Sequence, residues 1–428
     1  MVAARDVNGI GRSFMSGSHG GLENGRLATL LILFFGRTES YVLRMAIPPL
    51  IPILMEQFEW NSYQVGLLAS AYLWTYAFAQ VPWGAAVDRW GGKKSLTLGW
   101  LITLIGSLAF AMGTNLEQLV LSRLLFGVGA ASILVASTVM VSEIYSRQER
   151  GRAMGVISAS SSVGTLLAGL IIPWLFATSL QLPNLDVWRS VAVVVTLPAI
   201  LAAFSLSKTH GISRTKPNGS TTIVETPPTF SKRSLLKDSR LYLMSAALIG
   251  YVAGSDIPAT WIYVYLQQEY RLSGTLAGSI GSLSLFVPAI ISPLLSGWLS
   301  DHFGVRARVA AIGAVFASAS VTLLAFRLPL HITVLALIVY GTFTLFLTPI
   351  FSMPAEVWSI EVAGTALSIA VGFSQVAAAI LPIASGYLLT RTGNFGVIWL
   401  LGSCIYLVAA IALLLIPEKK SQIRARQS

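Results

Sequence analysis

The stretch Gly84–Leu96 reads GAAVDRWGGKKSL, and a shorter version of it, GWLSDHFG, recurs at Gly297–Gly304. In each copy a glycine comes first, an aspartate stands at the fifth position and a second glycine at the eighth. The two copies lie 213 residues apart, and other residues repeat at the same offset, among them Glu143 with Glu356. Because chance rarely places so many matches at one offset, the chain is predicted to consist of two structurally similar halves.

Long apolar runs on both sides of these stretches predict the fold class. Hydrophobic residues make up 54% of the chain and charged residues 11%, compared with about 25% charged in typical soluble domains. Each run can cross a hydrocarbon core of about 30 Å, and strand-like alternation is absent, so we predict an all-α integral membrane protein. This composition excludes a disordered chain and a nucleic-acid-binding domain and disfavours a soluble enzyme. The twelve predicted transmembrane helices are Leu27–Met55, Tyr63–Val87, Ser95–Gly113, Leu116–Val141, Gly151–Ala177, Val187–Ser207, Leu241–Gln268, Thr275–Ser300, Arg308–Phe326, Ile332–Met353, Gly364–Thr390 and Phe395–Ile416.

The basic residues predict the orientation of the chain. With a cytoplasmic N-terminus, 22 of the 29 Lys and Arg residues fall in cytoplasmic segments, four fall outside and three lie within spans. Because cytoplasmic loops carry the excess of Lys and Arg in membrane proteins, we expect both termini in the cytoplasm and a multi-pass protein of the cell membrane. The expected parts are an N-terminal tail (1–26), a first six-helix bundle (27–207), a flexible cytoplasmic linker (208–240), a second six-helix bundle (241–416) and a C-terminal tail (417–428).

The sequence lacks the patterns of residues that catalysis or metal binding would require. Cys404 is the single cysteine, and neither His302 nor His331 has metal-ligating neighbours in the sequence. No phosphate-binding loop and no catalytic dyad is recognisable. We therefore expect no cofactor, no metal and no enzymatic activity.

Three motifs resemble those of the major facilitator superfamily. Gly84–Leu96 resembles the signature loop between the second and third helices of that family, and Gly297–Gly304 its weaker copy. Arg123–Ala131 (RLLFGVGAA) resembles the fourth-helix motif, and Glu149–Gly155 (ERGRAMG) resembles the entry into the fifth helix. The resemblance implies twelve transmembrane helices in two pseudo-symmetric six-helix bundles, with a substrate site between the bundles.

The resemblance also implies a conformational latch on the cytoplasmic side. Asp88 is expected to face the start of the eleventh helix near Gly364, and Asp301 to face the start of the fifth helix near Gly151, because a carboxylate is stabilised at a helix N-terminus. The alternative is that these charges only set the topology. The residues assigned to the latch are Gly84, Asp88, Arg89, Gly91, Lys93, Asp301, Arg306 and Arg123.

Arg44 is the strongest candidate for binding a substrate. An arginine in the middle of a membrane span is costly unless it faces a polar cavity, and Pro48 removes the backbone hydrogen bond to the Arg44 carbonyl. The run Tyr41–Arg44 with Pro52 resembles the first helix of anion:cation symporters and organophosphate:phosphate antiporters, in which the matching Arg binds the anionic group of the substrate. The span Leu241–Gln268 lacks the second Arg of the phosphate antiporters, so a carboxylate is favoured. An internal salt bridge is the alternative role for Arg44.

Two buried acids are candidates for proton coupling. The anion:cation symporters carry a glutamate where this chain has Ala130. Asp256 lies in a Gly254–Pro258 segment that is typical of a broken helix, and it could approach Arg44 across a cavity. Glu39 lies ~140° around the first helix from Arg44 and is expected to face a neighbouring helix, with Arg123 as a possible partner. Structural pairing is the alternative for both acids.

Six further side chains could line a substrate cavity, and four of them are assigned to substrate binding. The assigned four are Tyr41, Tyr76, Trp261 and Gln375, and the other two are Tyr72 and Tyr265. For the aromatic residues, packing in the core is the alternative. The sequence as a whole predicts a secondary active transporter that moves a small organic anion by alternating access with proton symport, as a monomer surrounded by membrane lipid and without nucleic acid. An efflux pump for drugs or metabolites and a non-transporting membrane sensor are the alternatives.

Overall fold

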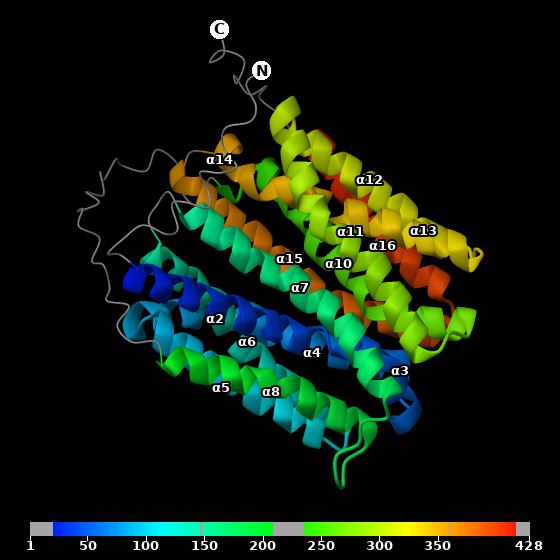
Figure 1. Cartoon of the computed structure of the whole chain (residues 1–428). Helices are drawn as coiled ribbons and strands as arrows, with labels where there is room; N and C mark the ends of the chain where they lie inside the picture. The colour runs from blue at the N-terminus through cyan, green and yellow to red at the C-terminus, as the bar shows by residue number, and fades with distance from the viewer. Residues whose placement is uncertain (1–19, 146–148, 209–234, 359, 417–428) are drawn as a thin grey trace, which may run out of the picture.

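The computed structural model describes residues 20–145, 149–208, 235–358 and 360–416 of the chain. These residues form helices and no strand, as predicted (Figure 1). Most of the predicted N-terminal tail (1–19), the whole predicted C-terminal tail (417–428) and most of the predicted linker (209–234) lie outside the described residues. The elements are α2 (Gly20–Arg44), α3 (Ile47–Phe58), α4 (Ser62–Trp90), α5 (Gly92–Met112), α6 (Leu116–Ile144), α7 (Arg150–Ala177), α8 (Val187–Lys208), α10 (Ser239–Tyr270), α11 (Gly274–Phe303), α12 (Arg306–Leu324), α13 (Leu330–Thr344), the 3₁₀ helix η1 (Leu345–Ser352), α14 (Pro354–Val357), α15 (Ile360–Thr392) and α16 (Phe395–Leu415).

The helices follow the twelve predicted spans in order. Ten spans are single helices, whereas the first span is divided into α2 and α3 and the tenth into α13 and η1. Among the described residues, nine helices are long and apolar enough to cross a membrane. The chain is therefore a multi-pass membrane protein.

The first span breaks where its prolines stand. Met45 and Ala46 separate the two helices, and α3 begins with Ile47, Pro48 and Pro49. Pro48 has no N–H to donate to the carbonyl of Arg44, which therefore lacks a partner within its own helix. The break leaves Arg44 as the last residue of α2.

The halves α2–α8 and α10–α16 meet along three helix pairs (Figure 1): α4 with α15, α7 with α11 and α3 with α10. We call the side on which α8 ends and α10 begins the linker side, and the opposite one the far side. On the far side the packing is so close that a Cβ at Gly66 would overlap the carbonyl of Pro382, and one at Gly278 would overlap Pro173. Glycine permits these approaches because it has no side chain.

The two halves separate toward the linker side. A Cβ added at Gly84, Gly155, Gly297 or Gly364 would meet nothing within 4 Å. These four glycines belong to α4, α7, α11 and α15. The same helices form two of the three pairs through which the halves meet, α4 with α15 and α7 with α11. The structure is thus closed at the far side and open at the linker side.

Candidate functional site

Arg44 lies among three tyrosine rings at the break in the first span. Its guanidinium carbon lies 5.4 Å from the centre of the Tyr41 ring, 5.1 Å from that of Tyr72 and 5.6 Å from that of Tyr76. Its Nε donates a 2.6 Å hydrogen bond to the Tyr72 hydroxyl. Two of the predicted substrate contacts, Tyr41 and Tyr76, therefore lie beside Arg44. Tyr72 belongs with them, one helical turn from Tyr76 in α4.

Arg123 satisfies the carbonyl groups that the break leaves without partners. Its Nη1 donates to the carbonyl of Leu43 at 3.4 Å and its Nη2 to that of Arg44 at 3.3 Å. The Arg123 side chain is 4% exposed. This position corrects the assignment of Arg123 to the latch, because Arg123 lies near the far-side end of α6. Its role is to hold the end of α2, and thereby Arg44, in place.

Asp256 shares a small cavity with these two arginines. The cavity has a volume of about 20 Å³ and is lined by Arg44, Tyr72, Arg123 and Asp256 among others, and a space of roughly this size holds one water molecule. The Asp256 Oδ2 atom is buried without a hydrogen-bond partner among the described residues. No ion pair joins Asp256 to Arg44 in the described part of the chain. The two charges therefore face a common space without contacting each other.

The predicted break in the helix at Asp256 is wrong. The helix α10 continues without interruption from Ser239 to Tyr270 and includes Pro258. Gly254, the residue whose carbonyl Pro258 cannot bond, packs closely against the ring of Tyr406. Close packing against α16 therefore accompanies the continuous helix at the position where the proline removes a backbone hydrogen bond.

A second cavity of about 20 Å³ lies on the other side of Arg44. It is lined by Arg37, Ser40, Tyr41, Arg44 and Tyr76 from α2 and α4, with part of α6. Arg37 is 8% exposed, and its Nε has no hydrogen-bond partner in the described chain. The helical period puts Arg37 and Arg44 on one face of α2, two turns apart, although Arg37 is not among the site residues predicted from the sequence. The surroundings of Arg44 thus include the buried Arg37 and Arg123, whereas Arg44 and Asp256 themselves are half-buried.

The remaining predicted substrate contacts lie elsewhere. Trp261 is fully buried, and its Nε1 donates a 2.8 Å hydrogen bond to Ser385 in α15. Gln375 lines neither cavity beside Arg44, and its Oε1 is buried without a partner among the described residues. Trp261 therefore joins α10 to α15 as a core residue, which was the alternative weighed for it.

Glu39 faces away from Arg44, as the helical period predicted. It lines a separate cavity between α2, α7 and α8. Pairing with Arg123 is wrong, because the Arg123 nitrogens bond the carbonyls of Leu43 and Arg44 while the Glu39 Oε1 has no partner among the described residues. Asp256 remains the acid beside Arg44.

The latch aspartates are exposed in this structure. Asp88 and Arg89 lie at the end of α4, and both are exposed. Asp301 pairs at 3.5 Å with Arg306, within its own copy of the motif, and is 71% exposed. Among the described side chains, neither aspartate has a hydrogen bond or ion pair with the helix that the resemblance assigned to it.

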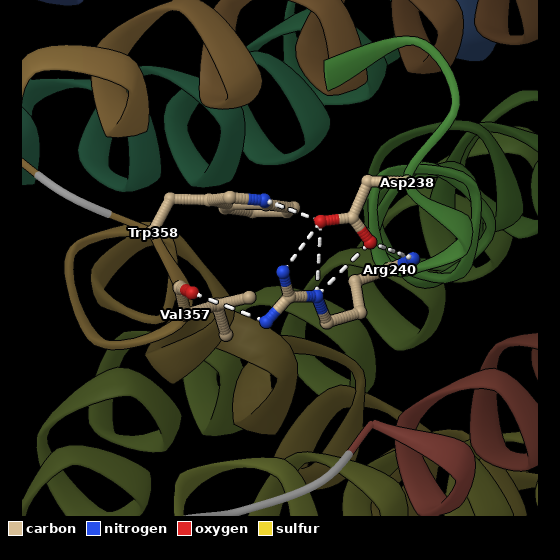
Figure 2. Close-up of polar contacts among 4 residues, drawn as sticks. All are labelled: Asp238, Arg240, Val357 and Trp358. Atoms are coloured by element: carbon tan, nitrogen blue, oxygen red, sulfur yellow. Dashed lines mark hydrogen bonds and ion pairs between the residues drawn. The ribbon is translucent and has the colours of Figure 1, made fainter. Parts of the chain in front are cut away.

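A polar cluster at the start of α10 was not predicted from the sequence (Figure 2). The Asp238 carboxylate accepts hydrogen bonds from Arg240 Nε at 2.9 Å, from Arg240 Nη2 at 2.6 Å and from Trp358 Nε1 at 2.9 Å. Arg240 also donates to the Val357 carbonyl at 3.3 Å. The bonds from Arg240, with a smaller contribution from Trp358, outweigh burial and lower the Asp238 pKa to about 2.

This cluster corrects the predicted extent of the flexible linker. Leu235, which precedes it, is fully buried. Among the last residues assigned to the linker, Asp238 and Arg240 therefore contact the segment between η1 and α15, whereas Leu236 and Lys237 are exposed. A tryptophan 120 residues away in the chain supplies one of the hydrogen bonds, and no local sequence pattern could have indicated that contact.

Comparison with known proteins identifies the fold and the family. The family model described as Major Facilitator Superfamily matches residues 33–287 and 251–427. The chain is similar to a probable L-galactonate transporter of Escherichia coli (strain K12), with 23% identity over 90% of this chain and 87% of that protein. It is also similar to a hexuronate transporter of Bacillus subtilis (strain 168), with 22% identity over 91% of this chain and 94% of that protein. Multidrug resistance protein 2 of Bacillus subtilis is 25% identical over 67% of this chain and 70% of its own length.

Solved structures share the fold. A D-xylose–proton symporter has a TM-score of 0.77 at 16% identity, covering 92% of this chain and 98% of that chain. A bacterial homologue of the human lysosomal transporter Spinster, in an inward-facing and unoccupied conformation, has a TM-score of 0.73 at 17% identity, covering 91% of this chain and 95% of that chain. The predicted all-α membrane architecture is confirmed.

Proposed function

The chain belongs to the Major Facilitator Superfamily, and from this premise we propose that it is a secondary active transporter that moves a small organic carboxylate by alternating access with proton symport. The relatives named above as galactonate and hexuronate transporters act on sugar acids, which carry one carboxylate on a polar body. Their similarity spans nearly the whole chain, which supports a substrate of the same class. The cell membrane is the proposed location.

The observation that carries this proposal is Arg44 among its tyrosines. A guanidinium offers two parallel N–H donors to a carboxylate, and Nε of Arg44 is already held by the Tyr72 hydroxyl. Arg123 is engaged with backbone carbonyls, so Arg44, with Arg37 beside the second cavity, is available to an anion. Buried charges require partners, and the excess of arginine over aspartate in this region favours a negatively charged substrate.

The separation of the halves supports alternating access. Each cavity beside Arg44 holds about 20 Å³, which is too little for a sugar acid, so the halves must move for substrate to bind. We assign the basic linker side to the cytoplasm by its charge, which makes this an inward-open conformation. Asp88 and Asp301 would then contact the helix starts near Gly364 and Gly151 only in the outward-open state, when the linker side closes.

Asp256 is the proposed proton carrier. It lines the same cavity as Arg44 without forming an ion pair. When a substrate carboxylate neutralises Arg44, the positive charge that favours ionised Asp256 is cancelled, and protonation becomes easier. Anion and proton would then cross together. Glu39 is the weaker candidate, because it lines a different cavity.

The proposal is tested with the purified protein in liposomes. An inwardly directed proton gradient should drive uptake of labelled galactonate or glucuronate, and a protonophore should abolish accumulation. Arg44→Ala is the matched inactive control. If no sugar acid is taken up and the protein instead extrudes an apolar drug in a proton-driven manner, the proposal is wrong and efflux is the function.

A further inference from the structure

A large cavity lies between α2, α7 and α8, apart from the space around Arg44. Its volume is about 620 Å³, within the range of about 300–1,000 Å³ that is usual for small-molecule sites. Its lining is apolar except for Thr38, Glu39 and Ser205. We call it the α2–α7–α8 groove.

The groove opens toward the hydrocarbon of the membrane. Three of its lining residues are large apolar side chains with high exposure: Leu31 at 45%, Phe35 at 63% and Leu201 at 67%. Exposed apolar side chains on transmembrane helices face lipid. A ligand would therefore reach the groove laterally from the bilayer rather than from the space between the halves.

Glu39 is an unsatisfied acceptor inside this apolar groove. The side chain is 9% exposed, and its Oε1 is buried without a hydrogen-bond partner among the described residues. Thr38 beside it is 7% exposed, and its Oγ1 also lacks a partner there. A buried polar group without a partner is costly. Two adjacent unpartnered oxygen atoms in one groove therefore indicate a ligand that brings hydrogen-bond donors.

We propose that the α2–α7–α8 groove binds a lipophilic amine in its protonated form. The ammonium group donates one hydrogen bond to the Glu39 carboxylate and a second to the Thr38 hydroxyl. Its apolar body packs on the leucine, isoleucine and valine side chains of α7 and α8. The charge of Glu39 favours a cation over a neutral alcohol, and the need for a donor favours an amine with N–H over a quaternary ammonium.

Occupation of the groove should inhibit transport without competing with substrate. Gly164 of α7 packs on the backbone of Thr38, and Gly169 of α7 packs on Ser282 of α11. A ligand beside Thr38 therefore lies against the helix that joins the two halves. Restraining α7 would slow the exchange between conformations while leaving Arg44 accessible.

The test uses the purified full-length protein and a hydrophobic carbodiimide, which modifies protonated carboxyl groups within apolar surroundings. Modification of Glu39 and of Asp256 is followed by mass spectrometry in the presence of dodecylamine, dodecyltrimethylammonium or 1-dodecanol. Dodecylamine should protect Glu39, with a half-protecting concentration at least tenfold below those of the other two compounds, and should leave Asp256 unprotected. Equal protection by all three compounds would mean that the groove accepts any alkyl chain and would overturn the proposal, as would failure of Glu39 to react at all.

Two variants distinguish loss of the binding site from loss of the folded structure. Glu39→Gln removes the charge and should weaken dodecylamine binding, measured by equilibrium dialysis, by at least tenfold. Ala202→Phe places a ring inside the groove and should abolish binding of the amine, while Asp256 keeps its reactivity toward the carbodiimide, which reports an intact fold. Unchanged amine binding in both variants would contradict the proposed site even if both variants fold.

Discussion

Tyr72 joins the two arginines of the candidate site. Its hydroxyl accepts the 2.6 Å hydrogen bond from Arg44 Nε, and the guanidinium carbon of Arg123 lies 4.9 Å from the centre of its ring. Arg123 in turn bonds the carbonyl of Arg44. The three residues come from α2, α4 and α6, so the orientation of Arg44 depends on how three helices of the first half pack together.

Replacing Arg44 with lysine should abolish most substrate binding although the charge is kept. Lysine cannot supply the planar pair of donors or the Nε bond to Tyr72, and hydrogen bonds to charged groups contribute about 1.5–3 kcal/mol. We expect affinity for the transported sugar acid to fall about tenfold to a hundredfold, measured by competition in uptake assays. Arg391→Lys, an exposed arginine at the far-side end of α15, is the matched control, and equal affinities in both variants would exclude the proposed role of Arg44.

Asp256→Asn should separate substrate exchange from proton coupling. The amide keeps the size of the side chain but cannot carry the proton, so exchange of substrate across the membrane should continue while accumulation against a gradient stops. Both are measured in liposomes with labelled sugar acid. If Asp256→Asn still accumulates substrate and Glu39→Gln does not, the coupling acid is Glu39.

Asp88→Asn should shift the conformational equilibrium further toward the inward-open state. Asp88 is exposed in the open structure, so its loss affects only the closed linker side, where a contact with a helix N-terminus is worth about 0.3–1 kcal/mol. Spin labels at Lys94 and Phe303 should report a larger population at long distance. Uptake assays should show slower transport with nearly unchanged substrate affinity. Glu117→Gln, an exposed acid on the far side, should have no such effect, and a large loss of affinity in Asp88→Asn would place Asp88 at the substrate site instead.

Asp238→Asn should destabilise the protein in a pH-dependent manner. The folded state lowers the pKa of Asp238 from 3.8 to about 2, so its stabilising effect is fully present above the unfolded pKa and is lost as the pH falls through the folded value. Thermal unfolding in detergent should show that the variant loses about 1–2 kcal/mol of unfolding free energy. This loss should be equal at pH 7 and pH 5 and smaller at pH 3. Trp358→Phe removes one donor and should cost less, and a loss that does not change with pH would point to packing rather than charge.

The proposed orientation is tested with single cysteines at Lys94 and Asn184 in a variant with Cys404 replaced. Both positions are exposed, and they lie on the linker side and the far side. In intact cells a membrane-impermeant reagent should label the cysteine at Asn184 but not the one at Lys94, because the proposed orientation places the basic linker side in the cytoplasm. Labelling of the cysteine at Lys94 alone would reverse the proposed topology. Labelling of both cysteines from outside would exclude their placement on opposite sides of the membrane.

The sequence alone determined the architecture, because its signals are local or periodic. Apolar length predicts each span, and the glycine–aspartate pattern at Gly84 and Gly297 identifies two related halves. The helical period placed Tyr41 and Arg44 together and Glu39 on another face of α2. These features depend on backbone geometry within one helix, which is the same in every packing arrangement.

Only the tertiary structure decided how side chains from distant helices pair. Arg123 bonds the Arg44 carbonyl, which Pro48 leaves without a partner, and the neighbouring Leu43 carbonyl, and the sequence motif alone could not reveal that use of its guanidinium. Trp261 turns toward Ser385 rather than a cavity, Glu39 borders a groove with α7 and α8, and Trp358 bonds Asp238. Each of these contacts depends on the relative rotation and separation of the helices. Close approach at glycine residues helps to set that geometry, and no single helix specifies it.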